Sequence, residues 1–404
     1  MIKQTVHIAI TFFLLAPPVM AQNTYNEISL PALMKKKQEG DSNMVIVDVR
    51  TNGEFYDSAS RGMQSNIGRL KGSLHIELRN LQQDPEAIRQ LAAYKDKDIY
   101  LICSHSYRSR SASNILLKNG FTHVNNVQGG MTEWFRRYDE LFPYKNSFYE
   151  TSGAYKNISA SQVTADLLAG KKLLLIGISN TPRFFYDTAT ITFYEYFPLF
   201  KDAIYFNAGD SLKVLDEVRR ANGQPVVLFN MVNNGAAEMA DWLVKKGVKE
   251  VSYLVGNNYY FYEYIRNKGL VARTKRFMVE KNVIEFITAP NYCSKVNDNG
   301  TLLIDLRHDT LFARTTSGIK YDYKNAKGSV NFFADRGAGS FMQAFPDKNK
   351  EYVLMSLNGI AGLELADVLA RDGYRISWLM GGLQRLEWYT INMENFGCKD
   401  ILIK

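Results

Sequence analysis

One cysteine stands where a strand pattern gives way to a helix pattern, and this stretch has residues suited to chemistry. The apolar, β-prone run 99–102 ends at Cys103, small polar residues follow, and Ala112, Ile115 and Leu116 then share one helical face. A short loop before a helix turns its backbone N–H groups inward and, with the helix dipole, forms a cradle for an anion. The pattern therefore predicts that Cys103 is a nucleophile held as a thiolate.

The residues that follow Cys103 are candidates for binding a substrate. We expect Arg108 to hold the loop and an anionic substrate with its permanent charge. Two further side chains have alternatives: His105 could donate to a substrate or be an exposed loop histidine, and Arg110 could assist substrate binding or be solvated. The remaining loop residues are expected to act chiefly through backbone N–H groups, and with His105 they are Ser104, Ser106 and Tyr107.

Four motifs in this order resemble the rhodanese-like (sulfurtransferase) family. The first is the strand-and-turn segment 47–55, the second is the glycine-bearing segment 67–76, and the third is the Cys-x4-Arg loop that runs from Cys103 to Arg108. The fourth is the pair Gly129 and Gly130 followed by Trp134. The resemblance covers Ile28 to about Tyr138. Phosphatases on the same fold have one more residue between Cys and Arg, so the loop length favours a sulfur-sized ligand.

The resemblance implies a two-step sulfur relay with Cys103 as nucleophile and Arg108 as its cation. A small anionic donor such as thiosulfate would leave a persulfide on Cys103, and a thiol or a protein cysteine would accept the sulfur. Neither a cofactor nor a metal is implied. The family often has Arg after the Cys and Gly three positions on, where this chain has Ser104 and Ser106, so a donor other than thiosulfate stays open.

Two charged residues of the first motif are expected to be structural. Asp48 lies at the predicted end of a strand, and Arg50 is expected to pair with Glu54 and so to order the neighbouring turn. The alternative is that Asp48 and Arg50 take part in the reaction.

An internal repeat predicts the domain organisation. Strand, loop and helix recur after Cys103, Asn230 and Ser356, which lie 127 and 126 residues apart. The sequence thus predicts α/β architecture with three tandem rhodanese-like domains, each a parallel sheet with helices on both faces. The expected boundaries are a signal peptide at 1–21, a catalytic domain at 22–150, and degenerate domains at 151–275 and 276–404.

The second and third repeats lack the residues that the sulfur chemistry needs. Asn230 stands in place of the cysteine and Gly235 in place of the arginine in the second repeat, and Ser356 and Ala361 take these places in the third. Because neither Asn nor Ser can carry a persulfide, we predict that only the first domain is catalytic. The other two would be structural or would shape the entrance to Cys103.

The N-terminus and the composition bear on location and partners. The segment 1–21 has Lys3, an apolar core and small residues before Gln22, which predicts an export signal and a periplasmic or secreted protein without stable membrane insertion.

The formal charge of +8 over 404 residues is modest, and it fits a slightly basic solvated surface or a preference for anionic substrates. The sequence has no long basic tract or zinc-like Cys/His spacing, so nucleic acid is not an expected partner.

Two further features have open readings. Cys293 and Cys398 could form a disulfide in an oxidising compartment or could be two buried thiols, and spacing does not decide. The aromatic stretch 257–264 could be a core helix or a partner surface.

Two alternatives to a sulfurtransferase remain at this point. One is a binding, scaffold or redox-sensing protein in which Cys103 is not catalytic. The other is a phosphatase or arsenate reductase with the same nucleophile.

Overall fold

The computed structural model describes residues 24–179, 199–231, 235–279, 283–295, 300–313, 324–359, 361–393 and 396–403. The predicted signal segment 1–21 lies outside these residues. None of the helices in the described ranges is long and apolar enough to span a bilayer.

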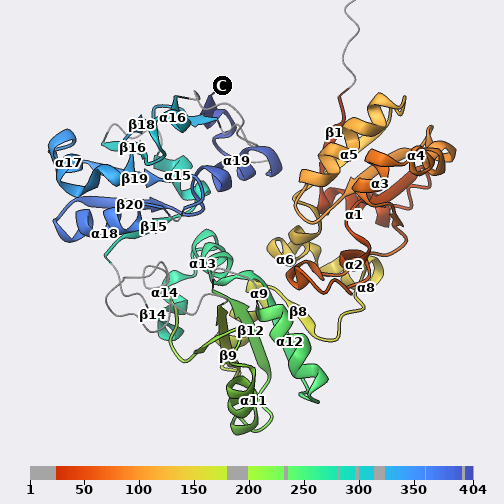
Figure 1. The fold of residues 1–404 in the computed structure, drawn as a ribbon, viewed down its shortest axis with the longest axis horizontal. Coiled ribbons are helices and arrows are strands. Elements are labelled where there is room, and N and C mark those ends of the chain that lie inside the picture. Colours follow the sequence, from red (N-terminus) through yellow and green to blue (C-terminus); the bar gives the residue numbers. More distant parts are fainter. Residues whose placement is uncertain are drawn as a thin grey trace, which may run out of the picture.

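Three five-stranded parallel sheets repeat one topology along the chain (Figure 1). The first has the order β1 (Asn26–Ser29), β6 (Val124–Gln128), β5 (Asp98–Ile102), β2 (Met44–Asp48) and β4 (Leu74–His75). The second has the order β8 (Lys156–Ile158), β13 (Val251–Asn257), β12 (Val226–Asn230), β9 (Leu174–Ser179) and β11 (Ile204–Asn207). The third has the order β15 (Glu285–Ile287), β20 (Arg375–Leu379), β19 (Glu351–Met355), β16 (Thr301–Asp305) and β18 (Val330–Asn331). The predicted fold class is confirmed.

Helices cover both faces of each sheet. Those of the first unit are α1 (Leu30–Gln38), α2 (Asn52–Phe55), α3 (Leu78–Gln83), α4 (Pro85–Leu91), α5 (Tyr107–Lys118), α6 (Glu133–Arg136), α7 (Tyr138–Leu141) and α8 (Lys145–Phe148). Those of the second are α9 (Ala160–Leu168), α11 (Ser211–Arg220), α12 (Ala236–Lys245), α13 (Asn258–Asn267) and α14 (Val271–Thr274). Those of the third are α15 (Ala289–Lys295), α16 (Asp309–Phe312), α17 (Gly337–Ala344), α18 (Leu363–Arg371) and α19 (Gly382–Asn392).

A short antiparallel pair closes each unit at the same place. β3 (Arg69–Leu70) pairs with β7 (Tyr149–Glu150), β10 (Leu199–Phe200) with β14 (Met278–Val279), and β17 (Asn325–Ala326) with β21 (Leu402–Ile403). The lysine that follows the first strand of each pair, Lys71, Lys201 or Lys327, donates its backbone N–H to the segment beside the second strand. The pairing of β14 ties Met278 and Val279 to the second unit, a few residues beyond the expected join at 275.

Strand β5 shows why the sheet is buried on both faces. Ile99 and Leu101 pack into the core on one side, and Tyr100 and Ile102 pack into the core on the other. Successive side chains of a strand point to opposite faces, so a continuous apolar run is what a sheet covered by two helix layers requires. This run delivers the next residue, Cys103, to the carboxyl edge of the first sheet.

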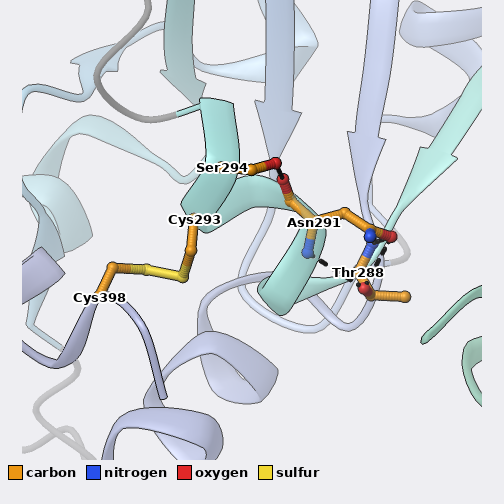
Figure 2. The surroundings of a disulfide bond; sticks show 5 residues. All are labelled: Thr288, Asn291, Cys293, Ser294 and Cys398. Carbon is orange, nitrogen blue, oxygen red and sulfur yellow. Dashed lines mark hydrogen bonds between the residues drawn. A yellow bond between two sulfur atoms is a disulfide. The ribbon is translucent and has the colours of Figure 1, made fainter. Parts of the chain in front are cut away.

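Cys293 and Cys398 form a disulfide, with their Cα atoms 5.6 Å apart (Figure 2). The bond joins α15 to the C-terminal segment of the third unit. Cys103 is the free cysteine. The structure thus decides the question that the spacing of the cysteines left open.

Candidate active site

Cys103 lies directly after the central strand β5, between that strand and α5. Its side chain is buried, with 1% of the residue exposed. The hydroxyl of Ser109, on the first turns of α5, donates to the Cys103 Sγ across 3.5 Å. In parallel α/β sheets the carboxyl edge of the strands is where ligands bind, and Cys103 occupies that edge.

The loop after Cys103 is tightly held, yet three of its N–H groups have no partner among the residues that the structure describes. Ser106 adopts a left-handed backbone conformation, with φ 75°, and its hydroxyl donates to the Val127 carbonyl at 2.9 Å. Within the described parts of the chain, the backbone N–H groups of Ser104, His105 and Ser106 donate to no acceptor. Unpartnered amides at the N-terminus of a helix favour an anion there.

A second segment fixes the loop from behind. The N–H of Met131 donates to the Cys103 carbonyl at 2.8 Å, and the N–H of Thr132 donates to the Ser104 carbonyl at 3.1 Å. Gly130 makes this approach feasible, because a Cβ at this position would lie 2.2 Å from the Cys103 carbonyl oxygen. The glycine pair of the fourth motif therefore serves close backbone packing against the loop.

Arg108 is engaged by a carboxylate that the sequence did not pair with it. Its two terminal nitrogens donate to the Glu54 carboxylate at 2.5 and 2.7 Å, and one of them also donates to the Ser104 hydroxyl at 2.9 Å. Burial acts to raise the pKa of Glu54, but Arg108 and Thr51 outweigh it and lower the pKa to about 2. Arg108 thus ties the loop to α2 as a charged pair.

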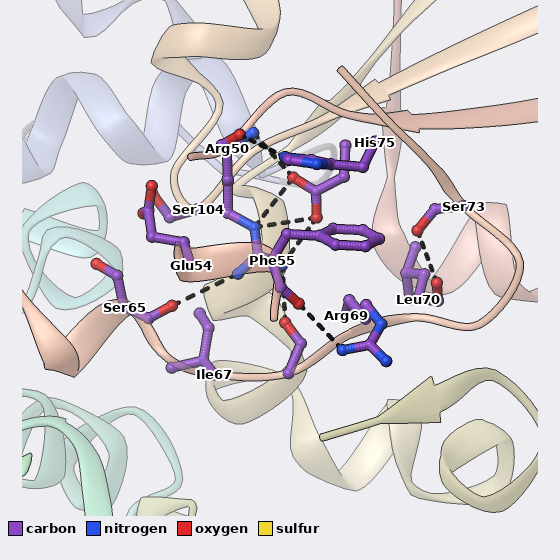
Figure 3. Close-up of polar contacts among 12 residues, drawn as sticks. Arg50, Glu54, Phe55, Ser65, Ile67, Arg69, Leu70, Ser73, His75 and Ser104 are labelled. Atoms are coloured by element: carbon purple, nitrogen blue, oxygen red, sulfur yellow. Dashed lines mark hydrogen bonds and ion pairs between the residues drawn. The ribbon is translucent and has the colours of Figure 1, made fainter. Parts of the chain in front are cut away.

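The expected pairing of Arg50 with Glu54 is wrong. Arg50 instead pairs with Asp48, two residues earlier, with Nη2 2.7 Å from Oδ2, and both side chains are fully buried. Arg50 also donates to the Gly68 carbonyl at 2.8 Å. The carbonyl oxygen of Arg50 lies 2.9 Å from Nε2 of His75 (Figure 3). These contacts join β2, β4 and the turn before β3, which is a structural role.

The other predicted loop residues lie in different environments. Ser104 and Ser106 are buried, and Tyr107 is 54% exposed. His105 is half-buried, and its Nδ1 lies 3.0 Å from the Ser104 hydroxyl. Burial and the nearby charges of Arg136 and Arg108 lower the pKa of His105 to about 3, so this ring is neutral at pH 7.

Arg110 pairs with a carboxylate on the edge strand of the sheet. Its Nε lies 3.1 Å from the Glu27 carboxylate on β1. This contact holds α5 against the edge of the sheet. Among the described residues, the structure has no group of three His, Cys, Asp or Glu side chains that could hold a metal ion.

Comparison with known proteins places residues 30–137 in a described family. The model of the rhodanese-like domain matches these residues. An uncharacterised protein of Bacillus subtilis, YqhL, is 31% identical over 117 residues, which are 29% of this chain and 81% of that protein. The chain belongs to the rhodanese-like family.

Two further comparisons cover a shorter and a longer part of the chain. A tRNA uridine(34) hydroxylase of Cytophaga hutchinsonii is 30% identical over 104 residues, which are 26% of this chain; the chain spans only 30% of that hydroxylase's length. Among solved structures, an anaerobic ergothioneine biosynthesis enzyme from Chlorobium limicola aligns over 89% of this chain and 96% of its own. The identity is 13% and the TM-score 0.25, too low for an argument about shared arrangement.

The second rhodanese-like unit uses the cysteine position for helix capping. The Asn230 Oδ1 accepts the N–H of Ala236 at 2.9 Å, and its Nδ2 donates to the Tyr253 hydroxyl at 3.1 Å. The following helix, α12, begins six residues after Asn230, whereas α5 begins four residues after Cys103.

The third unit fills the same position with its own loop. The Ser356 hydroxyl accepts the N–H of Gly359 at 3.0 Å, and α18 begins only at Leu363. The glycine contact is nevertheless kept, because a Cβ on Gly382 would lie 2.0 Å from the Ser356 carbonyl oxygen. The scaffold of the rhodanese-like site thus persists where its thiol, its arginine and the first helical turn do not.

Sequence reasoning missed several residues of the site. Glu54 was expected to pair with Arg50 and not with Arg108. Arg136 and Tyr260, which line a cavity together with His105, and Trp388, which stacks on Arg136, were not singled out. Arg136 comes two residues after the Trp134 of the fourth motif, and this position was the available signal. The aromatic stretch 257–264 forms part of α13, with Phe261 and Tyr262 buried in the core and Tyr260 beside Arg136.

The Glu54 contact predicts a pH-dependent stability. Because the pKa of Glu54 is lower in the folded chain than its usual 4.5, the ionised carboxylate stabilises the fold above pH 4.5, and this contribution is lost as the pH falls towards 2. We expect Glu54→Gln to lower the free energy of unfolding at pH 7 by roughly 2 kcal/mol, and the difference from the wild type to shrink at pH 3. Urea unfolding at both pH values measures it.

A surface pair supplies the control for this prediction. Glu86 pairs with Arg89 on α4, and both side chains are more than half exposed. Glu86→Gln should change stability by less than about 0.5 kcal/mol. An equal effect of the two substitutions on the free energy of unfolding at pH 7 would show that the pair of Arg108 and Glu54 does not stabilise the fold.

Proposed function

We propose that the first domain is a sulfurtransferase that carries a sulfane sulfur as a Cys103 persulfide. The observation that carries the proposal is the loop itself, in which a free thiol at the end of β5 is followed by three amides that find no partner among the described residues, at the start of α5. Such amides would donate to an anion on sulfur, and an anion is both the attacking and the product form of this nucleophile.

The proposed reaction has two balanced steps. The Cys103 thiolate attacks the outer sulfur of thiosulfate, the S–S bond of the donor breaks, and sulfite leaves with the bonding electron pair. The persulfide anion then remains on Cys103. An acceptor nucleophile, such as cyanide or a thiolate, attacks the outer sulfur and regenerates the Cys103 thiolate. No cofactor and no metal takes part in either step.

The polar contacts of the loop give each neighbour a part in this reaction. Arg108, held by Glu54, fixes the Ser104 hydroxyl and so the loop beside the thiol. His105 is neutral at pH 7, and its ring can form a hydrogen bond with the sulfur donor. Ser109 donates to the sulfur and so orients it. Ser106 and Tyr107 form the start of α5, next to the thiol. Arg110 anchors that helix to β1.

We further propose that the protein is exported and works in the periplasm or outside the cell. The segment 1–21 has the pattern of a signal peptide. The Cys293–Cys398 disulfide fits an oxidising compartment, where such bonds persist. We propose a small anionic donor and a thiol or protein-cysteine acceptor as its partners, and neither nucleic acid nor a membrane.

Mass spectrometry after incubation with thiosulfate tests the proposed reaction. The expected result is an adduct of about 32 Da, one sulfur atom, on the peptide that contains Cys103, with an equal amount of sulfite released. The full-length Cys103→Ser variant should form no adduct. A wild-type chain without adduct from thiosulfate or polysulfide would overturn the proposal. Turnover of an aryl phosphate would instead favour a phosphatase.

A further inference from the structure

A cavity of about 180 Å³ lies between the active-site loop of the first domain and the second domain. The first domain contributes His105 and Thr132 to its lining, and the second contributes Asn230, Asn257 and Tyr260. Asn230 is the residue that replaces the cysteine in the second repeat. The degenerate site of the second domain therefore opens toward the loop that carries the thiol.

This cavity has one charged residue among the described residues that line it. That residue is Arg136 at the end of α6, and none of the described lining residues carries a carboxylate. The Nη1 of Arg136 lies 3.5 Å from Oε1 of Glu133, yet neither atom makes a hydrogen bond. Burial raises the pKa of Glu133, while the charge of Arg136 acts to lower it. Among the described residues, Arg136 therefore has hydrogen-bond donor capacity left.

All three domains hold the Arg136 guanidinium in place. It lies 4.6 Å from the ring centroid of Tyr260 on α13 and 4.7 Å from that of Trp388 on α19. Helices α6, α13 and α19 occupy equivalent places in the three repeats, after the pair Gly129 and Gly130, the weaker match Gly256-Asn257, and the pair Gly381 and Gly382. Figure 1 shows each of them on the side of its domain that faces the centre of the molecule. Arginine stacks on aromatic faces while its N–H edge stays available for hydrogen bonds.

A second arginine strengthens this arrangement. Arg385 of the third domain stacks on Tyr260 and Trp388 as well, at 5.2 and 4.2 Å, and it pairs with the buried Glu263 of the second domain at 2.6 Å. Glu263 is hydrogen-bonded to Arg385, whereas the Arg136–Glu133 pair is longer, at 3.5 Å, so Arg136 is the less compensated of the two arginines. The aromatic residues thus preorganise Arg136, which lowers the entropic cost of binding a ligand.

The cavity connects directly to the reactive loop. The hydroxyl of Thr132, which lines the cavity, donates to the Ser104 carbonyl at 2.9 Å, and His105 lies between the cavity and the rest of the loop. Arg136 follows Thr132 by about one helical turn. An anionic group bound to Arg136 would therefore sit close to the loop of Cys103.

We propose that Arg136 is the specificity-determining residue of a small-oxyanion site in this cavity, and that the second and third domains serve to build the site. Resting on the proposed sulfur transfer, this inference assigns the site to the oxyanion end of the sulfur donor. The guanidinium binds the oxygens of that end and directs the sulfane sulfur toward Cys103.

Thiosulfate binding to the full-length Cys103→Ser chain, measured by calorimetry, tests the site without sulfur transfer. We expect Arg136→Gln to weaken binding roughly ten- to a hundredfold, the effect of losing a charge-assisted hydrogen-bond donor. Arg136→Lys should recover part of the loss. Arg137→Gln is the matched control, since the neighbouring Arg137 pairs with Glu140 and does not line the cavity. Circular dichroism checks that each variant is folded.

Steady-state kinetics in the otherwise wild-type chain supply the second readout. Arg136→Gln should raise KM for thiosulfate by a similar factor and leave KM for the acceptor cyanide unchanged. Binding and KM within twofold of the Arg137→Gln values would overturn the site, while a Cys103 adduct in the same chain would leave the proposed function standing. Weakened thiosulfate binding in a chain that forms no Cys103 adduct would retain the oxyanion site and overturn the sulfur transfer.

Discussion

Replacing Cys103 by serine is expected to lower sulfite release from thiosulfate at least about a thousandfold, to the level without protein. A serine hydroxyl carries no sulfane sulfur, and the other two cysteines are joined in a disulfide. The exchange of one sulfur for one oxygen should leave the packing of the buried side chain nearly unchanged. Sulfite release and the far-ultraviolet circular dichroism spectrum, measured side by side, check both expectations.

Returning a thiol to the third domain should not restore this activity. In Cys103→Ser/Ser356→Cys the new thiol would follow β19 as Cys103 follows β5, but α18 starts seven residues after position 356 and Ala361 stands where Arg108 would be. A thiol alone therefore lacks both the helix N-terminus and the cation. Ser356→Cys in the otherwise wild-type chain should keep full activity. More than about a tenth of wild-type turnover in the double variant would contradict a requirement for the loop, since that loss corresponds to only about 1.4 kcal/mol.

Most of the fold could be predicted from the sequence because the same physical constraints recur in all three repeats. The buried parallel strands read as apolar runs, and each run ends at a position whose contacts are set by backbone geometry. Gly130 and Gly382 are examples, because each meets the carbonyl of the residue that follows the central strand. Constraints of this kind depend on chain topology, so they survive the loss of the catalytic residues and stay visible as a repeat.

The partners of the charged residues were harder to predict. Arg50 has two acidic neighbours in the sequence, Asp48 and Glu54, and only the folded turn decides that it takes the nearer one and leaves Glu54 for Arg108, 54 residues away. The disulfide is closed across 105 residues, and residue spacing gave no sign of it. Such pairings depend on which side chains the tertiary structure brings together.

The surroundings of Arg136 illustrate the same limit between domains. Its ring contacts come from Tyr260 and Trp388, one from each of the other units. Tyr260 follows Gly256-Asn257, and Trp388 follows Gly381 and Gly382, which are the places that correspond to Gly129 and Gly130 of the first repeat. The packing of the three domains brings Arg136, Tyr260 and Trp388 together, and the sequence motifs do not encode this packing.

Gly130→Ala and Gly382→Ala form a matched pair that should separate stability from chemistry. Both positions have positive φ, 63° and 57°, and an added Cβ would lie 2.2 or 2.0 Å from a backbone carbonyl oxygen. The left-handed conformation alone costs an alanine roughly 1–2 kcal/mol, and the displaced backbone adds to this cost. We expect each substitution to lower the free energy of unfolding by about 2–4 kcal/mol.

Their effects on sulfur transfer should differ sharply. In Gly130→Ala the displaced carbonyl belongs to Cys103, so the thiol and the amides of Ser104 and His105 shift together, and a displacement of about 1 Å at a reacting group costs roughly a hundredfold in rate. In Gly382→Ala the displaced carbonyl belongs to Ser356, which carries no chemistry. Sulfite release per folded molecule at saturating thiosulfate, with the folded fraction taken from urea unfolding curves, should therefore fall only in Gly130→Ala, while Gly382→Ala, at the start of the helix that carries Trp388, should at most raise KM for thiosulfate. An equal loss in both variants would mean that the third domain acts on Cys103 directly, because strain at Ser356 would then reach the thiol across the domain interface.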